Sequence, residues 1–385
     1  MIRNLMNTPH APPYVWQRST WPAWQYDSQA LAETLAQARL SQGVVLGKAQ
    51  AVGMQGEAFS SVINEIWFQE VMATAAIEGE KLDFDQVRSS VMRMLGIADT
   101  GVSSRHVDGL VEVMQDAVQN FLAPLDEDRL CRWQSALFPG GTSGIKRIEI
   151  GRYRTFAEPM QIVSGPPGHE VTHYRAPDSA QVASEMARFI AWLNQPSADD
   201  GIVRAAIAHL WFETIHPFED GNGRIGRAII DLVIAQDANS PIRLYSLSRQ
   251  LQKNRSAYYD ALNLAQCGNG DITSWVQWFA TQFTAACINS ERLIDQALDK
   301  ARYWATHSAD QLNERQRKVL QKLLDAGDGG ILGGLTAEKY CKITGTSKAT
   351  ATRDLADLLQ KQALILRGVG KATKYYANVP GWTHA

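Results

Sequence analysis

The most constraining feature of the sequence is the stretch His216–Arg227, HPFEDGNGRIGR. Before it, Val203–Thr214 carries apolar side chains at helical spacing and no helix-breaking residue. Pro217 disfavours the helical conformation at the residue before it, so that helix should end at His216. After the stretch, Arg224–Ala235 again has the pattern of a buried helix. The stretch is therefore predicted to be a loop that connects two helices.

The residues of this loop match an anion site. Gly221, Asn222 and Gly223 tolerate positive φ, so their backbone N–H groups can turn inward together. Amides gathered at the start of a helix bind anions, most often phosphate. Arg224 and Arg227 fall in the first turns of the second helix, from which a guanidinium reaches phosphate oxygens.

Two further side chains add reactive chemistry to the loop. Asp220 offers a hard oxygen ligand for Mg²⁺ beside the predicted phosphate site. His216 can accept a proton near neutral pH. The alternative is a polar loop without catalytic function, in which the histidine side chain is simply hydrogen-bonded. For a lone histidine this is the more common role. The whole string instead indicates phosphoryl or nucleotidyl transfer.

The stretch resembles the Fic family signature, His-x-Phe-x-Asp/Glu-Gly-Asn-Gly-Arg-x-x-Arg, at every fixed position. Fic proteins mostly transfer AMP from ATP to a hydroxyl of a target protein. The resemblance implies His216 as the base and Asp220 as the Mg²⁺ ligand on the α and β phosphates. It also implies that Arg227 binds the γ-phosphate and that Phe218 is the apolar anchor of the loop. The phosphate cradle would consist of Gly221, Asn222, Gly223 and Arg224. Gly223 resembles the AMP-transferring branch, because Doc-like relatives that phosphorylate carry Lys there.

A second segment is predicted to regulate this loop. Glu57–Glu78 has the pattern of one long helix, closed by Gly79. A carboxylate in the last turn faces the negative end of the helix dipole, which is unfavourable by roughly a few tenths of a kcal/mol. Thr74, Glu78 and Gly79 resemble the Fic inhibitory pattern Ser/Thr-x-x-x-Glu-Gly/Asn, in the class whose inhibitory helix is N-terminal. The resemblance implies that Glu78 pairs with Arg227 and occupies the γ-phosphate site. An ordinary surface charge is the alternative.

Two other segments are similar to parts of the Fic active site. Met160–Val163 and Val171–Tyr174 favour strands around a turn, and the resemblance implies a flap over the site that binds the target segment by strand addition. Ile162 and Val163 would lie nearest the nucleotide, although a hairpin can also be decoration. Tyr258 and Tyr259 would line the adenine side, and core packing is the alternative for one of them. Gln266 stands where relatives often carry Asn, which puts that nucleotide contact in doubt.

The residues from 311 onward form a separate predicted module that resembles a winged helix. The expected elements are helices 314–326, 336–343 and 347–362, followed by strands 364–367 and 374–377. From Gln311 to Val379, basic residues outnumber acidic ones about two to one. The candidate DNA contacts are Ser347, Lys348, Thr350, Ala351 and Arg353 in the major groove, with Lys371 and Lys374 on phosphates. Protein contacts are the alternative, since the third helix also carries Asp354 and Asp357.

The chain as a whole is predicted to be mainly α: a Fic-type helical core with a small β-hairpin flap, plus the C-terminal winged helix-turn-helix domain. The expected boundaries are an N-terminal arm and helix (1–56), a Fic domain with its inhibitory helix 57–79 and flap 158–177 (57–300), a linker (301–310) and the C-terminal module (311–385). Trp16, Trp21 and Trp24 are expected to pack the arm onto the body or onto a second copy.

Composition indicates the cellular compartment of the protein and its possible partners. The four cysteines are scattered and form no CxxC pair, which favours reduced thiols in the cytoplasm. No apolar run reaches the ~18 residues that span a bilayer, so no membrane partner is expected. The net charge of −2 argues neither for nor against nucleic acid.

The leading prediction is an autoinhibited, Mg²⁺- and ATP-dependent adenylyltransferase acting on a Ser, Thr or Tyr hydroxyl of a target protein, and on itself. A nucleotide-sensing DNA-binding regulator that uses the C-terminal module is the alternative from another class. Net removal of AMP by the same site is a third possibility. A homodimer is expected because inhibitory helices in Fic relatives often lie near an interface.

Overall fold

The structure is a computed structural model that describes residues 14–52, 57–97, 101–164, 171–328, 330–368 and 373–383. The chain divides into two compact units, one of residues 1–49 and 63–291 and the other of residues 50–62 and 292–385. Among the described residues, none of the helices is both long enough and apolar enough to cross a bilayer.

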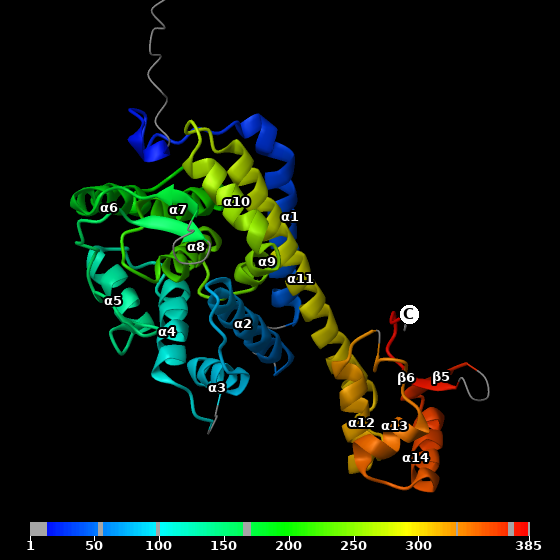
Figure 1. The fold of residues 1–385 in the computed structure, drawn as a ribbon. Helices are drawn as coiled ribbons and strands as arrows, with labels where there is room; N and C mark the ends of the chain where they lie inside the picture. The colour runs from blue at the N-terminus through cyan, green and yellow to red at the C-terminus, as the bar shows by residue number, and fades with distance from the viewer. Residues whose placement is uncertain are drawn as a thin grey trace, which may run out of the picture. The chain divides into compact units, whose positions relative to one another are not determined.

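The described elements are mostly helices, as predicted (Figure 1). They are a 3₁₀ turn Val15–Gln17, α1 Ser28–Val52, α2 Glu57–Ile77, α3 Phe84–Met94, α4 Arg105–Gln119, α5 Glu127–Leu137, β1 Thr142–Ser143, β2 Lys146–Arg147, β3 Gln161–Ser164, β4 Val171–Arg175, α6 Ser179–Asn194, α7 Gly201–Ile215, α8 Asn222–Ala238, α9 Leu247–Lys253, α10 Arg255–Gln266, α11 Thr273–Thr306, α12 Glu314–Asp325, α13 Ala337–Thr344, α14 Lys348–Gln360, β5 Leu364–Arg367 and β6 Lys374–Ala377. The helical connector predicted at 301–310 is continuous with the preceding helix as far as Thr306.

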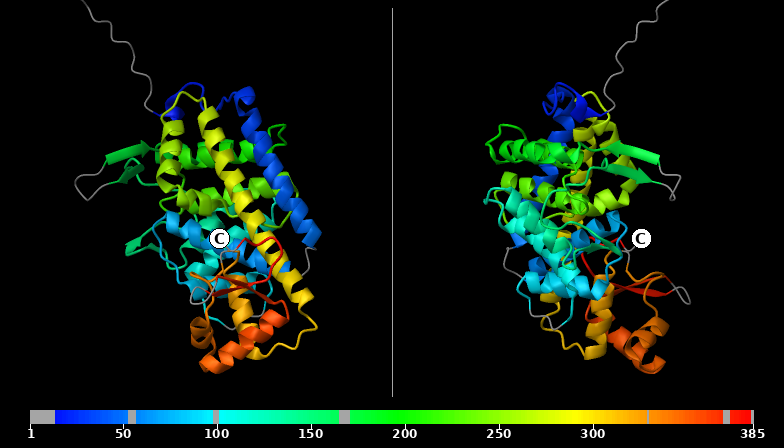
Figure 2. Two further views of the ribbon diagram at one scale, coloured as in Figure 1. Left: turned by 90° about the vertical axis from the view of Figure 1, so that its right-hand side faces the viewer. Right: turned by 60° about the vertical axis from the view of Figure 1, so that its left-hand side comes forward.

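Helices α7 and α8 form the centre of the first unit, with other helices around them (Figures 1 and 2). Every residue of α7 except Arg204 is buried, so the helix is apolar on all sides, as a central helix must be. The loop between the two helices is residues 216–221, within the stretch expected from the sequence. The two helices that flank the candidate loop therefore belong to the core of the first unit.

The N-terminal arm packs on the body of the first unit, which was one of the two predicted options. Trp16 donates its indole N–H to the carbonyl of Arg175 at 2.9 Å, and Trp21 donates to Glu185 at 2.8 Å. Trp21 also makes edge contacts with Trp24 and Trp211. The arm therefore covers the region around β4, α6 and α7.

The predicted flap is an antiparallel hairpin. Strand β3 pairs with β4, with an irregularity between Ile162 and Val163. Ile162 lies opposite Tyr174, whose hydroxyl donates to the carbonyl of Thr214 at 2.7 Å. The hairpin is thus fastened beside the end of α7, next to His216.

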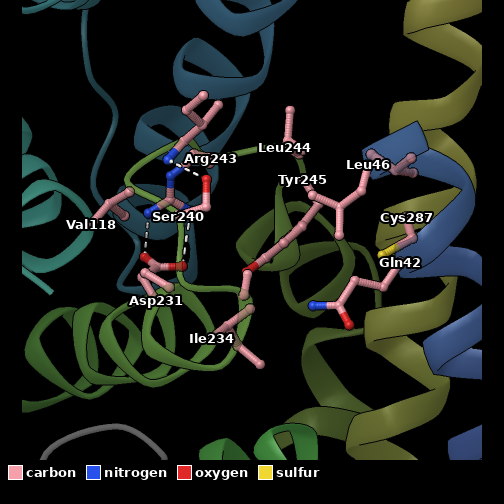
Figure 3. Close-up of a pocket in the computed structure, with 14 residues that line it drawn as sticks. Gln42, Leu46, Val118, Asp231, Ile234, Ser240, Arg243, Leu244, Tyr245 and Cys287 are labelled. Carbon is pink, nitrogen blue, oxygen red and sulfur yellow. Dashed lines mark hydrogen bonds and ion pairs between the residues drawn. The ribbon is translucent and has the colours of Figure 1, made fainter. Parts of the chain in front are cut away.

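A buried ion cluster joins α2 to α8, and Figure 3 shows its Arg243–Asp231 pair. Both guanidinium nitrogens Nη1 and Nη2 of Arg243 bond the two carboxylate oxygens of Asp231 on α8, and Glu70 of α2 lies 3.7 Å from Arg243. Ser246 and Ser248 donate to the Glu70 carboxylate. The adjoining cavity, about 20 Å³, has room for little more than one water molecule. The cluster therefore ties α2 to the body and is not a ligand pocket.

The second unit has its own core. Val319, Leu320, Leu323 and Leu324 of α12 pack with buried residues of α13, α14, β5 and β6. Leu335 forms an isolated antiparallel bridge with Tyr375 of β6, beside the two-stranded β5–β6 sheet. The predicted helices and hairpin are all present near their predicted bounds.

The candidate DNA-contact residues differ in their exposure to solvent. Ser347, Lys348 and Arg353 are exposed and Thr350 is half-buried, although the Ser347 side chain caps α14 by accepting from the Thr350 N–H. Lys374 is half-buried against Gly334, and Lys371 lies outside the described residues. Ala351 is fully buried, so its prediction as a groove contact is wrong. It falls on the same face as Leu355 and Leu358, the side of the helix that packs on the core.

Candidate active site

The loop of the signature stretch is held by its own asparagine. Asn222 accepts from the Phe218 N–H at 2.9 Å and donates to the Phe218 carbonyl at 2.8 Å. Phe218 itself is fully buried against Tyr153 and Phe212, which makes it the apolar anchor predicted from the sequence. The Asn222 side chain therefore braces the loop, and only its backbone N–H remains for the predicted phosphate cradle.

The amides of the loop form a helix N-terminus, and the three expected residues do not all turn in the left-handed region. Gly221 alone has positive φ (92°), while Asn222 and Gly223 are already the first residues of α8. The first N–H groups of a helix have no partner within it. The predicted anion site would thus consist of helix-end amides that follow one left-handed glycine.

His216 stands at the end of α7 in a left-handed conformation, with φ 51° and ψ 61°. This conformation costs energy for a side chain other than glycine and is held by its surroundings. Arg154 supplies that hold, because its Nε donates to the His216 carbonyl at 2.8 Å and its backbone N–H donates to the Pro217 carbonyl at 2.9 Å. Burial lowers the pKa of Arg154 to about 10.

Arg227 makes the predicted contact with Glu78. Its Nη2 lies 2.8 Å from Glu78 Oε1 and 3.0 Å from the Thr74 carbonyl, and its Nε donates to the Thr74 hydroxyl at 2.6 Å. Burial alone would lower the pKa of Arg227, but the Glu78 carboxylate raises it. Arg227 Nη1 is buried without an acceptor among the described residues.

The end of α2 places two carboxylates on the site. The Gly79 N–H donates to the Ala76 carbonyl and the Glu80 N–H donates to Ala75, with Gly79 at φ 82°. This is the pattern of a Schellman turn, which needs a residue that tolerates positive φ. The chain turns at Gly79, so that Glu78 meets Arg227 and Glu80 meets Arg224.

Glu80 forms a chain of contacts that the sequence did not reveal. Arg224 Nη1 donates to Glu80 at 2.7 Å, and the other Glu80 oxygen lies 3.2 Å from His106 Nε2. Burial by itself would raise the pKa of Glu80, but the hydrogen bond from His106 and the charge of Arg224 lower it. The contact with Glu80 also raises the pKa of His106. Both arginines of the signature therefore have a carboxylate from one short segment.

Gly223 leaves the room that Glu78 occupies. A Cβ placed at residue 223 would lie 2.2 Å from Glu78 Oε1 and 3.1 Å from Arg227 Nη1. Any side chain there would displace the carboxylate. The glycine that resembles the AMP-transferring branch is thus also what admits Glu78 to the site.

Asp220 presents its carboxylate at the mouth of the loop. One oxygen accepts from the Ser143 hydroxyl, the other from the Gly221 N–H at 2.6 Å, and Arg224 Nη2 lies 3.5 Å away. No group of three or more His, Cys, Asp or Glu suited to a metal occurs among the described residues. Mg²⁺ that binds with a nucleotide needs only one or two carboxylates, because phosphates and waters complete its shell. The half-exposed Asp220 fits that role.

Two parts of the chain match known protein-family models. Residues 124–234 match the model of the Fic/DOC family, and residues 14–97 match a domain of unknown function, DUF4172. The chain contains a Fic/DOC domain.

Curated relatives carry the same domain. The chain is 27% identical over 240 residues to protein adenylyltransferase fic-1 of Caenorhabditis briggsae, covering 60% of this chain and 42% of that protein. It is 26% identical over 277 residues to protein adenylyltransferase Fic of Drosophila grimshawi, covering 70% and 49%. The chain thus spans less than half the length of these relatives.

One solved structure supports the fold. A Fic family protein from Desulfovibrio desulfuricans is 19% identical, with a TM-score of 0.52, over 96% of this chain and 98% of its own. At this identity, the likeness concerns the fold alone.

The two tyrosines predicted for the adenine side of the Fic domain take different places. Tyr258 is buried and its hydroxyl lies 2.7 Å from His209 Nε2, so it is the core residue that the packing alternative allowed for one of the pair. Tyr259 is partly exposed, and its hydroxyl donates to the Ile77 carbonyl at 3.4 Å. Tyr259 therefore borders the end of α2. Gln266 is buried, and the side chain of Val163 lies outside the described residues.

Several residues of the Fic site escaped the sequence analysis. Ser143 and Phe138 come from the loop after α5, where Phe138 lies under the Arg224 guanidinium at 4.8 Å. Glu80 did carry a signal, because it is a second acid two residues beyond Glu78. Glu213, three residues before His216, also carried one, since residues three apart share a helix face.

Removing the two hydrogen bonds between the Asn222 side chain and the Phe218 backbone should destabilise the first unit. Asn222→Ala leaves the Phe218 N–H buried without an acceptor, which costs about 1–3 kcal/mol. Denaturant unfolding followed by tryptophan fluorescence measures this loss. Asn222→Asp keeps an acceptor for the Phe218 N–H but has no donor for the Phe218 carbonyl. The stability of this variant should therefore lie between those of Asn222→Ala and the unsubstituted protein. Equal stability of all three proteins would contradict the bracing role.

Proposed function

We propose that the Fic domain transfers AMP from ATP to a Ser, Thr or Tyr hydroxyl of a target protein, and that Glu78 holds it in a low-activity state. The observation that carries the proposal is the pair of signature arginines. Arg227 Nη1 and Arg224 Nε are buried N–H groups with no acceptor among the described residues. Unpaired buried donors are costly, and phosphate oxygens are the acceptors that guanidinium groups fit best.

The loop residues account for the transfer step. His216 takes the proton of the target hydroxyl, whose oxygen attacks the α-phosphorus of ATP, and pyrophosphate leaves. The helix-end amides, Arg224 and Arg227 stabilise the charge that develops on the phosphates. Asp220 would hold Mg²⁺, which supplies further neutralisation of the α and β phosphates. The adenylyltransferase names of the curated relatives support AMP as the group transferred.

The same contacts support autoinhibition. Glu78 satisfies the Arg227 donor that the γ-phosphate would otherwise use, and Glu80 does the same at Arg224. ATP must therefore displace these carboxylates or bind in a pose unsuited to in-line attack. Removal of AMP from a modified target, with water as the attacking group, is the reverse direction that the same residues would support.

His216→Ala should abolish transfer. In a Glu78→Gly background, incubation with Mg–ATP labelled at the α-phosphate should give at least about 100-fold less labelled protein, because general-base catalysis contributes about that much or more. ATP labelled at the γ-phosphate is the matched control and should label neither protein. Equal α-label in both proteins would show that His216 is not the base, and γ-label would indicate phosphorylation instead.

Glu78→Gly should raise α-label incorporation by about tenfold or more, because a charged hydrogen bond is worth about 1.5–3 kcal/mol. Glu80→Ala should raise it by a smaller factor, since Glu80 also has His106 as a partner. Glu65→Ala, on the same helix but bonded to Gln69, is the control and should leave activity unchanged. Unchanged labelling and unchanged ATP affinity in Glu78→Gly would contradict the inhibitory role.

A second candidate function is DNA binding by the C-terminal unit. Asp354 is engaged by Arg315, Tyr340 and Asn313, and Asp357 by Gln316 and Lys361. Both acidic side chains of α14 are thus paired with a cation. Among the described residues, no ion pair occupies the exposed Lys348 and Arg353, which favours a phosphate-binding face.

The 385-residue protein should bind duplex DNA with a strong salt dependence. Lys348→Ala/Arg353→Ala should reduce the slope of log K against log salt by about 2, roughly one for each lost phosphate contact. Arg317→Ala/Lys322→Ala on the exposed side of α12 is the charge-matched control and should keep the slope. Binding that is absent or insensitive to salt would point to protein contacts instead.

A further inference from the structure

Helix α7 and its C-cap carry a row of three ionisable residues, and the signature assigns a role only to His216. His209, Glu213 and His216 follow each other at spacings of four and three, so they share one face of the helix. Glu213 and His209 are buried, and His216 is mostly buried at the C-cap. One buried carboxylate therefore lies between two imidazoles.

Glu213 has no lysine or arginine ion-pair partner among the described residues. Its ion pair is with His216, whose Nδ1 lies 3.5 Å from Oε2. The other oxygen, Oε1, is buried without a hydrogen-bond partner in the described part of the chain. Burial alone would raise the pKa of Glu213, but the contact with His216 and the nearby His209 lower it. A buried anion so poorly paired destabilises a fold, so packing does not explain it.

The helix opposite makes room for this carboxylate. A Cβ at Gly226 would lie 2.5 Å from Glu213 Oε1 and 3.0 Å from His209 Nδ1. Position 226 is one of the four variable positions of the signature, so the family pattern does not demand the glycine. Glu213 and Gly226 thus form a matched pair across α7 and α8.

His216 is fixed at its backbone by Arg154, but a rotatable imidazole needs a second restraint to act as a base. The geometry points to Glu213 as the positioning residue of His216, with the carboxylate facing Nδ1–H and Nε2 left as the atom that takes the hydroxyl proton. The inference deepens the proposed function and depends on His216 being the base. The 3.5 Å separation is long for a hydrogen bond, and such bonds tighten when substrate binds.

The chemistry follows from this orientation. A neutral imidazole has one N–H, and the carboxylate selects the tautomer that carries it on Nδ1. When Nε2 receives the proton of the target hydroxyl, the ring becomes a cation and Glu213 stabilises it without itself taking a proton. The hydroxyl oxygen then forms its bond to the α-phosphorus as pyrophosphate leaves with the bond electrons.

The first test uses the unsubstituted protein. Imidazole ¹⁵N spectra, with the His216 signals assigned by their loss in His216→Ala, report which nitrogen carries the proton in the neutral ring. Protonated Nδ1 and bare Nε2 are expected. The opposite tautomer would overturn the inference even if AMP transfer occurs.

The second test separates orientation from folding and from the proposed function. In the Glu78→Gly background, Glu213→Gln keeps the side-chain volume and should lower kcat for α-label transfer by about 100-fold or more, with KM for ATP within about twofold. Its His216 spectrum should show a mixture of tautomers. Thr214→Val is the control, because Thr214 is buried on the same helix and valine has nearly the same shape. The Thr214 hydroxyl bonds only the Leu210 carbonyl among the described residues, so this variant should keep the kcat and the His216 tautomer of the parent.

The outcomes are distinct. Unchanged kcat and an unchanged tautomer in Glu213→Gln would overturn the positioning role. A parent protein that transfers no AMP would instead contradict the proposed function, and the tautomer measurement would still decide the geometry. Should Glu213→Gln unfold, the tautomer found in the unsubstituted protein decides by itself whether Glu213 orients His216.

Discussion

The structure of the first unit depends on the burial of Arg227. A guanidinium with 3% of its side-chain surface exposed needs anionic partners in every state of the protein, because an unpaired buried charge is strongly destabilising. In this state the partners are Glu78 and two Thr74 oxygens. In an ATP-bound state phosphate oxygens would replace the carboxylate. The proposed inhibitory segment and the nucleotide would thus compete for one charge, and α2 must pack against α8 for the competition to exist.

Two glycines of α8 serve this arrangement in parallel. Gly223 leaves room for the Glu78 carboxylate, and Gly226, three residues further along the helix, leaves room for Glu213 and His209. Each position excludes any larger residue by contact with a carboxylate oxygen. The first turns of α8 therefore contact one acid that would regulate the site and another that would orient its base.

The sequence predicted the elements that local pattern controls. The ends of α2 and α7 follow from Gly79 and Pro217, and the Glu78–Arg227 contact follows from two separate motifs about 150 residues apart. It did not predict that Asn222 would brace Phe218, or which of Tyr258 and Tyr259 would be the core residue, because both depend on which neighbours fill the surrounding space. Ala351 was misassigned for the same reason: a small apolar residue at a helix start looks the same in sequence whether it faces the core or solvent.

The contacts along α2 differ in strength, and this difference determines how the site can open. Near the middle of the helix, Glu70 is fully buried with Ser246, Ser248 and Arg243, and breaking such a cluster costs about 3–5 kcal/mol. At its end, Glu78 and Glu80 are about 30% exposed, so water can take over their solvation once they leave the arginines. The weaker contacts lie at the Schellman turn, beyond the last helical residue Ile77. In the proposed mechanism, unwinding of this terminal turn would release Arg224 from Glu80 and Arg227 from Glu78, while the Thr74 contacts and the Glu70 cluster would keep the rest of α2 in place.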